Sequence, residues 1–329
     1  MTELNINFKK YYMSNDKKTV LGRIKETFKK EANIPSNLRL PSDIEFEISG
    51  NNVEMQLSTA AVGKNMQEDK ASFEGWALVL KRWGKFDKVF LSWYRPQLDP
   101  ESSAAAHYQR FLFRVDNFSW HFTSWFSVSA GCLKYLTDLK IDDVSNYYLS
   151  PPYNERDKND VQGTESVLEY QYSLGDWKDA LYSASNADYL NRQLPVGVFH
   201  KPVSNKTRIL PKNKSAIDIW GISKANELLI FELKADGNNK IGIITELYFY
   251  CCVMNRIQKG QFKYEKYDVL NLERISKTKK IKAYFFAPAL HPLIDRVLVD
   301  YLNAGTAPDV EFHYLKFPKE GDKPINLIF

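Results

Sequence analysis

Ser215–Gln258 reads SAIDIWGISKANELLIFELKADGNNKIGIITELYFYCCVMNRIQ, and this stretch decides the fold. Three apolar segments lie within it, at Ser215–Ile222, Leu228–Ala235 and Ile241–Ile257. The first two have the length of strands, and the third has the length and spacing of a helix. Each segment carries charge where core residues are expected, at Asp218, at Glu232 with Lys234, and at Glu246. Because an unpaired charge is costly to bury, these side chains require a partner.

The flanking sequence extends this core into a complete mixed sheet. We expect a helix over Gly175–Gln193, strands at Val196–Val203, Lys282–Ala287 and Val310–Phe317, and a further helix over His291–Asn303. The resulting order is a helix, three strands, a helix, a strand, a helix and a strand. Alternation of this kind predicts an α/β (α+β) fold in which a mixed sheet is flanked by helices.

The first half of the chain predicts a smaller, β-rich domain of unknown role. A helix is expected over Thr19–Ala32, a hairpin at Asp43–Ile48 and Val53–Leu57, and strands at Lys88–Tyr94 and Tyr108–Phe118, whereas Phe73–Trp83 fits a strand or a helix. The polar stretch between Leu149 and Gly163 is the best boundary. We therefore predict domains at 1–160 and 161–329, which suits a length of 329 residues.

An aromatic cluster lies near the end of the first half. It consists of Phe118, Trp120, Phe122, Trp125 and Phe126. Aromatic faces can stack on the bases of single-stranded nucleic acid. Aromatic residues also dominate ordinary cores, and the core is the favoured interpretation here.

Composition limits the class of protein. The chain is 44% hydrophobic and carries a formal charge of +5, which suits a folded, mildly basic protein compatible with nucleic acid. The three cysteines, Cys132, Cys251 and Cys252, form no disulfide or zinc pattern. We see no signal peptide and no apolar run long enough to span a bilayer, so a cytoplasmic protein without a membrane partner is expected.

The charged residues of the opening stretch predict a metal site. Glu232 and Lys234 share one face of their strand, because side chains alternate along a strand. If the two strands are neighbours, Asp218 converges on Glu232. Carboxylate oxygens are the ligands that Mg²⁺ or Mn²⁺ prefers. An acid two residues before a lysine occurs five times in the chain, so the context, rather than the tripeptide, distinguishes this pair.

Asp218, thirteen intervening residues and then Glu232-Leu233-Lys234 resemble the PD-(D/E)xK nuclease superfamily, which has the restriction-endonuclease-like fold. The resemblance covers roughly residues 175–317. It implies that Asp218 and Glu232 coordinate a metal ion and that Lys234 orients or activates the attacking water. Ile217 stands where the family pattern has proline, at a permissive position.

The helical segment supplies a second point of resemblance. Some members of the superfamily carry Gln-x-x-x-Tyr there, and this chain has Glu246 and Tyr250 at the same spacing. One helical turn separates the two, so they share a face. Because this chain has glutamate where the motif has glutamine, Glu246 is a candidate for an additional metal ligand. The first helix of the family often contributes a glutamate, and Asp188 and Asn191 leave that role open in this chain.

Basic residues between the first two predicted strands suggest contacts to phosphate. Lys201–Lys214 contains Lys201, Lys206, Arg208, Lys212 and Lys214 and no acidic residue. It could hold nucleic acid without sequence preference or be an ordinary solvated hairpin tip. Arg192 is a weaker phosphate candidate.

These features predict a nuclease dependent on Mg²⁺ or Mn²⁺ that hydrolyses phosphodiester bonds. We expect DNA rather than RNA as the substrate, and the protein could form a homodimer. An inactive nuclease-like fold that binds nucleic acid is the alternative, and a buried ion pair that only stabilises the core is a further one.

Overall fold

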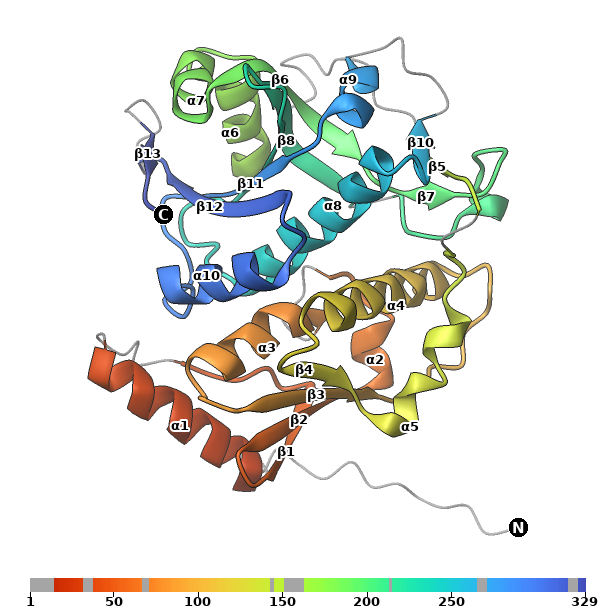
Figure 1. Ribbon diagram of the computed structural model, residues 1–329, viewed down its shortest axis with the longest axis vertical. Helices are drawn as coiled ribbons and strands as arrows, with labels where there is room; N and C mark the ends of the chain where they lie inside the picture. Colours follow the sequence, from red (N-terminus) through yellow and green to blue (C-terminus); the bar gives the residue numbers. More distant parts are fainter. Residues whose placement is uncertain are drawn as a thin grey trace.

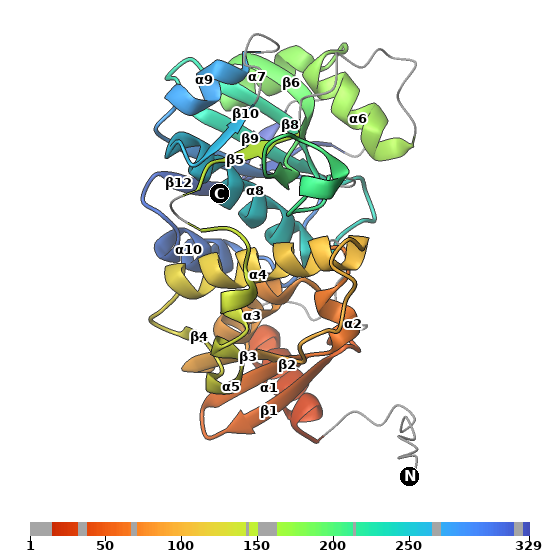
Figure 2. The same ribbon diagram turned by 90° about the vertical axis from the view of Figure 1, so that its right-hand side faces the viewer.

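The computed structural model describes residues 15–31, 38–66, 71–142, 145–150, 163–212, 215–264, 271–318 and 325–329. The chain forms two α/β halves stacked along its longest axis (Figure 1; Figure 2). Mixed sheets flanked by helices confirm the predicted α/β fold class. The predicted boundary at residue 160 and the predicted phosphate contact Lys214 lie outside the described residues.

The first half is built on a four-stranded sheet in the order β1-β2-β3-β4. Its strands are β1 (Ile44–Ser49), β2 (Asn52–Leu57), β3 (Lys88–Trp93) and β4 (Phe126–Val128). The predicted hairpin is confirmed as the antiparallel pair β1–β2, and β2, β3 and β4 run parallel. The helical segments are α1 (Asn15–Glu31), α2 (Thr59–Val62), α3 (Phe73–Arg82), α4 (Ser103–His121), α5 (Ala130–Leu133) and the 3₁₀ turn η2 (Leu136–Asp138).

The first half is more helical than the β-rich domain predicted from the sequence. The expected strand at Tyr108–Phe118 is wrong, because these residues lie within α4. Ser102 caps that helix by accepting a hydrogen bond from the Ala105 backbone. Every residue from 108 to 115 is buried, so α4 is covered on all sides over its middle turns. Parallel strands need such crossover helices, and α3 and α4 supply them.

The second half contains a six-stranded sheet in the order β13-β12-β11-β9-β8-β6. Its strands are β6 (Ala187–Pro195), β8 (Ala216–Ser223), β9 (Leu228–Leu233), β11 (Ile281–Phe286), β12 (Val310–Lys316) and β13 (Asn326–Leu327). Strands β6, β8 and β9 are antiparallel neighbours, whereas β9, β11 and β12 are parallel. A small separate sheet joins β5 (Tyr147–Leu149), β7 (Val198–Phe199) and β10 (Phe262–Tyr264).

Helices cover both faces of this six-stranded sheet. They are α6 (Thr164–Ser173), α7 (Lys178–Ser185), α8 (Gly242–Gln258), α9 (Leu272–Lys277) and α10 (Arg296–Gly305). Residues of α6 and α7 share one core cluster with Phe231 and Phe286. Helices α8 and α10 lie on the other face, which is turned towards the first half (Figure 1). The cluster on that side is continuous with the core of the first half, so the two halves share one interior.

Two predicted elements near the start of the second half are corrected. The helix expected over Gly175–Gln193 is wrong in its second part, since α7 ends at Ser185 and β6 follows. Asn186 adopts the left-handed conformation that commonly ends a helix. Only Val198–Phe199 of the strand expected at Val196–Val203 is extended and paired, and it belongs to the small sheet.

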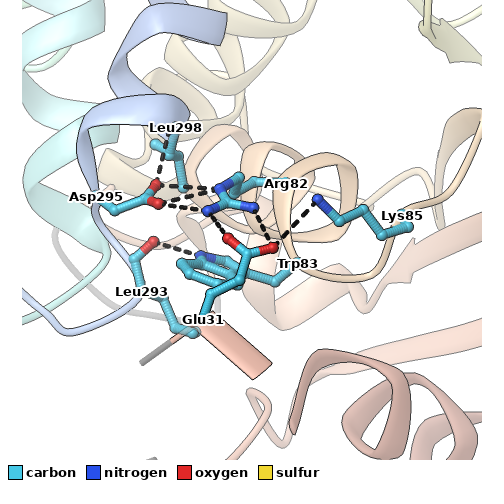
Figure 3. Close-up of polar contacts among 7 residues, drawn as sticks. All are labelled: Glu31, Arg82, Trp83, Lys85, Leu293, Asp295 and Leu298. Atoms are coloured by element: carbon cyan, nitrogen blue, oxygen red, sulfur yellow. Dashed lines mark hydrogen bonds and ion pairs between the residues drawn. The ribbon is translucent and has the colours of Figure 1, made fainter. Parts of the chain in front are cut away.

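Close packing joins α3 to elements of the second half. A Cβ atom at Gly75 would lie 2.3 Å from the Ile241 side chain. Only glycine at position 75 therefore allows α3 to approach the start of α8 so closely. At the other end of α3, Arg82 bridges Glu31 and Asp295, which caps α10 (Figure 3). The Trp83 indole donates to the Leu293 carbonyl at 2.8 Å (Figure 3). These contacts hold the two halves in one orientation.

Candidate metal centre

The predicted metal-site residues converge at one end of the strand pair β8–β9. Ile219 lies opposite Phe231 in this antiparallel pair, so one further step in the same register places Asp218 opposite Glu232. The strands no longer pair through the backbone at this point. Asp218 Oδ2 instead accepts a hydrogen bond from the Leu233 amide at 2.9 Å. A side chain thus replaces the ladder bond and fixes the Asp218 carboxylate beside β9.

Lys234 connects the strand acids to α8. Its ammonium contacts the Glu232 carboxylate and lies 3.1 Å from Glu246 Oε2. Parallel pairing with β11 supports the position of Lys234, because its amide donates to the Phe286 carbonyl at 3.0 Å. Helix α8 therefore brings Glu246 to the end of the sheet, as the sequence predicts, and Tyr250 is buried one turn further along.

The charges of this cluster do not balance. Three carboxylates, those of Asp218, Glu232 and Glu246, face the single ammonium of Lys234. Full ionisation would leave three negative charges with one direct ion-pair partner, while the buried Arg110 guanidinium interacts with Glu246 at longer range. Burial raises the pKa of Asp218 well above its usual value, although Lys234 opposes the shift. Burial, followed by repulsion from Asp218 and Glu246, raises the pKa of Glu232 in the same way.

The same surroundings keep Lys234 positively charged. Burial by itself would lower the pKa of its ammonium, since only 9% of the residue is exposed. Attraction to Glu232, and then to Glu246 and Asp218, outweighs that effect, so the pKa of Lys234 is raised. Burial, together with repulsion from Glu232 and Glu246, raises the pKa of the Tyr250 hydroxyl. Lys234 is therefore a cation at neutral pH, and Tyr250 is a neutral phenol.

Two buried carboxylate oxygens in the cluster have unused bonding capacity. Within the described residues, Glu232 Oε2 and Glu246 Oε1 have no hydrogen-bond partner, although both residues are only 1% exposed. Native proteins rarely leave such atoms unsatisfied, and a bound cation would satisfy both oxygens. Anionic oxygens near an excess of negative charge fit a divalent cation such as Mg²⁺ or Mn²⁺.

No three His, Cys, Asp or Glu side chains in the described ranges are close enough to hold an ion on their own. This arrangement suits Mg²⁺, which is often bound through one or two carboxylates and completes its shell with water and substrate phosphate. The residues present therefore fit the predicted ion as a shared site of protein and substrate rather than as a closed protein cage.

Helix α6 supplies two acids that the sequence analysis missed. Glu169 is buried and accepts hydrogen bonds from Gln193 at 2.7 Å and Arg192 at 3.4 Å. It lies within electrostatic range of Asp218, and burial raises its own pKa. Glu165, one turn earlier, accepts from the Ala235 amide and the Asn238 side chain, which fixes the loop after β9. The sequence signal that could have revealed these acids is their spacing: Glu165 and Glu169 are four residues apart, one helical turn, and precede the helix expected over Gly175–Gln193.

Asp188, which the sequence left as a candidate for the acid of the first helix, does not have that position. It lies on β6 rather than on a helix, and its carboxylate pairs with Arg274 at 2.8 Å. Asn191 is buried on the same strand, where it donates to the Tyr189 hydroxyl. A helical acid within electrostatic range of Asp218 is instead supplied by Glu169 of α6.

A strained backbone lies beside the cluster. Gln193, between residues that pair with Ile217 and Ile219, has a φ of 54°. Non-glycine residues rarely adopt this left-handed conformation, and within a strand it costs on the order of 1 kcal/mol or more. The turn of the backbone directs the Gln193 amide to Glu169. The strain is thus localised at the strand position facing Asp218.

The predicted phosphate contacts are distributed unevenly. Lys201 and Lys206 are exposed beside the turn η4 (Asn205–Thr207), and Lys212 is half-buried. Arg208 is also half-buried and donates to the Glu101 carbonyl of the first half at 3.3 Å. The prediction for Arg192 is corrected, because this residue is buried and its guanidinium contacts Ser166 and Glu169. Exposed Lys201 and Lys206 remain the candidates for phosphate.

The predicted aromatic stacking platform is mostly core. Phe118, Phe122, Trp125 and Phe126 are buried in contact with one another, whereas Trp120 is 73% exposed. The favoured interpretation of the cluster as core therefore holds for four of the five rings. Trp120 is the exception and lies at a different place from the carboxylates.

Metal binding is expected to become stronger as the pH rises. The pKa values of Asp218 and Glu232 are raised in the folded protein. Their contribution to folding stability is therefore full below the ordinary carboxyl pKa and is lost as the pH rises through the raised values. A cation would reverse that loss by binding the ionised forms. We expect Mg²⁺ to raise the melting temperature more at about pH 8.5 than at about pH 6. Thermal unfolding of the wild type and Asp218→Asn at both pH values measures this effect, and equal shifts in the two proteins would contradict it.

No helix among the described residues is long and apolar enough to cross a membrane. Comparison of the chain with protein-family models, with curated proteins and with solved structures finds no match. The chemistry of the cluster, and not a relative, is therefore the basis for assigning a function.

Proposed function

We propose that this protein is a nuclease that requires Mg²⁺ or Mn²⁺ and hydrolyses phosphodiester bonds, with DNA as the preferred substrate. One observation carries the proposal. Three carboxylates from two neighbouring strands and the following helix lie around one lysine at the end of a sheet, and two of their buried oxygens have no hydrogen-bond partner in the part of the chain that the structure describes. A purely structural ion pair needs one acid for one base, whereas Lys234 is surrounded by three acids and the buried Arg110 guanidinium interacts with Glu246 only at longer range.

The order of elements supports the resemblance to the PD-(D/E)xK superfamily. A helix, three strands, a helix and a strand are expected. The six-stranded sheet and its helices contain α7, β6, β8, β9, α8 and β11 in this order, with β6 in place of the strand expected at Val196–Val203 and with α9 between α8 and β11. The three strands are antiparallel neighbours, and β11 adds in parallel to β9. Asp218 and Glu232 lie on the middle and last of these three strands, and Glu246 lies on the helix.

Each residue has a definite task in this proposal. Asp218 and Glu232 would hold the ion together with water and substrate phosphate, and the bound ion would lower the pKa of its water and offset the charge of the phosphodiester. Glu246 would hold the Lys234 ammonium in place. Lys234 keeps its charge and can donate hydrogen bonds both to a nucleophilic water and to a phosphate oxygen. The Leu233 amide keeps Asp218 from rotating away. Glu169 and Gln193 position the strand that faces Asp218.

Cleavage assays test the proposal directly. Wild-type protein and Lys234→Ala are incubated with supercoiled, linear and single-stranded DNA and with RNA, in Mg²⁺, in Mn²⁺ and in EDTA. We expect the wild type to cleave DNA with either ion, EDTA to stop cleavage, and Lys234→Ala to reduce the rate by about a hundredfold or more, as for removal of one oriented donor.

Lys282→Ala is the matched control, because Lys282 also pairs with a glutamate, Glu227, at the opposite end of the same sheet. It should cleave like the wild type. Cleavage of none of the substrates, or equal cleavage by Lys234→Ala, would refute the proposal. Nucleic-acid binding without cleavage would favour an inactive nuclease-like fold.

A further inference from the structure

A cavity lies on the side of α8 that faces away from the carboxylate cluster. Its volume is about 520 Å³, within the range of pockets that bind small molecules. The end of α4, the second half of α8 and the segment between α10 and β12 enclose it, so both halves of the chain contribute to its wall. The lining residues that carry the argument are Trp120, His121, Tyr248, Asn255, Arg256 and Lys259.

Trp120 is the unusual member of this lining. Its indole is 73% exposed, although the neighbouring aromatic residues are buried. The ring of His121 meets it edge-on, with the two centroids 5.3 Å apart. An exposed tryptophan at the edge of a cavity offers a flat face on which a planar aromatic group can stack.

The wall behind this face is fixed. His121 Nδ1 and the Tyr248 hydroxyl are 2.7 Å apart and hydrogen-bonded, and Tyr248 is buried against Phe118. Burial, and then the charge of Lys259, lowers the pKa of His121 to about 4, so the imidazole is neutral at physiological pH. A planar ligand would therefore meet a preformed aromatic surface that needs no rearrangement.

The remaining wall is polar and basic. Lys259 is exposed and follows the last residue of α8. Arg256, one turn earlier, is held by its hydrogen bond to Gln261 Oε1 at 2.8 Å. Asn255 donates to Asp309 at 3.2 Å, and Asp116 is the acidic residue of the lining. Two basic side chains beside a stacking surface suit a ligand that combines an aromatic ring with an anion.

We propose that this cavity binds a nucleoside monophosphate, with its base on Trp120 and His121 and its phosphate towards Lys259 and Arg256. The site is separate from the carboxylate cluster, and the proposal does not depend on nuclease activity. The phosphorylated nucleotide can be free in solution or can be the 5′ end of a strand, since both present the same chemistry.

Calorimetric titration in EDTA tests this site without any contribution from metal. The probes are AMP, adenosine and inorganic phosphate. We expect AMP to bind saturably and about tenfold or more tightly than either adenosine or phosphate, because it uses both parts of the cavity. Trp120→Ala and Lys259→Gln should each weaken AMP binding by about tenfold. Competition by a 5′-phosphorylated oligonucleotide identifies a strand end as the source, and its failure identifies the free nucleotide.

Lys18→Gln removes an exposed lysine of α1, a helix that contributes no residue to the cavity lining, and serves as the control for charge. Its affinity for AMP should equal that of the wild type. Trp120 and Lys259 are both exposed, so far-UV circular dichroism should show that their variants remain folded. Absence of saturable binding of AMP, GMP, CMP and UMP to the wild type would overturn the proposal, as would unchanged affinity in folded Trp120→Ala.

Discussion

Replacing Glu232 by glutamine is expected to abolish cleavage and, in the absence of metal, to stabilise the folded protein. The first effect follows because the amide cannot supply the anionic oxygen that a divalent ion requires. We expect the rate to fall by about 10³-fold, or roughly 4 kcal/mol of transition-state free energy. The second effect follows because Glu232 is one of three buried carboxylates that share Lys234.

The stability gain in Glu232→Gln should be on the order of 1 kcal/mol and should be largest at alkaline pH, where the wild-type acids ionise. Urea unfolding in EDTA measures it. Glu227→Gln is the control from the other end of β9, where the acid is matched by Lys282 at 2.9 Å. That variant should keep full activity and gain no stability. Loss of stability in metal-free Glu232→Gln would show that its carboxylate serves the core rather than an ion.

The largest loss of stability is expected from Glu74→Gln in the first half. Glu74 and Arg114 are almost fully buried, and Arg114 Nε donates to Glu74 Oε1 at 2.7 Å. Arg114 also donates to the Ala71 carbonyl at 2.7 Å, and Thr245 of α8 donates to Glu74 Oε2 at 3.0 Å. Removal of one charge leaves the Arg114 guanidinium buried without a counterion. Such changes cost about 3–5 kcal/mol.

A double-variant cycle separates the cost of the orphaned charge from the value of the pair. Glu74→Gln alone should lower the free energy of unfolding strongly, and the pair Glu74→Leu with Arg114→Met should recover most of the loss. Glu26→Gln, which breaks an exposed pair with Lys30, is the control and should unfold like the wild type. A loss of less than about 1 kcal/mol in Glu74→Gln would contradict the argument.

The strands around the site could be predicted because their apolar runs are buried on both faces. Ser215–Ile222 and Leu228–Ala235 correspond to β8 and β9 within two residues, and Ile241–Ile257 corresponds to α8 within one. The start of this half was harder. Residues 187–195 carry Asp188, Asn191 and Arg192 among apolar neighbours, which obscures the period of a strand. Their pairing with β8 decides their structure, and a single segment does not reveal that pairing.

The candidate site was predictable where it depends on local order and not where it depends on contacts across the fold. Strand alternation and helical spacing were enough to group Asp218, Glu232, Lys234 and Glu246. Glu169 was missed because α6 approaches the site from outside the predicted elements. Arg192 is buried and Trp120 is exposed, contrary to what a phosphate contact and a core aromatic would require. Tertiary packing decides this burial, and residue type alone does not predict it.

The interior shared by the two halves has a consequence during synthesis on the ribosome. The hydrogen bond from Thr245 to Glu74 joins residues 171 positions apart, and the bonds between Arg82 and Asp295 span 213 positions. The first half therefore emerges with its α3–α4 surface uncovered and must wait until α8 and α10 have been translated. At ordinary elongation rates this interval lasts roughly ten to thirty seconds. Throughout it the nascent chain presents an apolar surface, so efficient production of this protein should depend on chaperones that cover that surface.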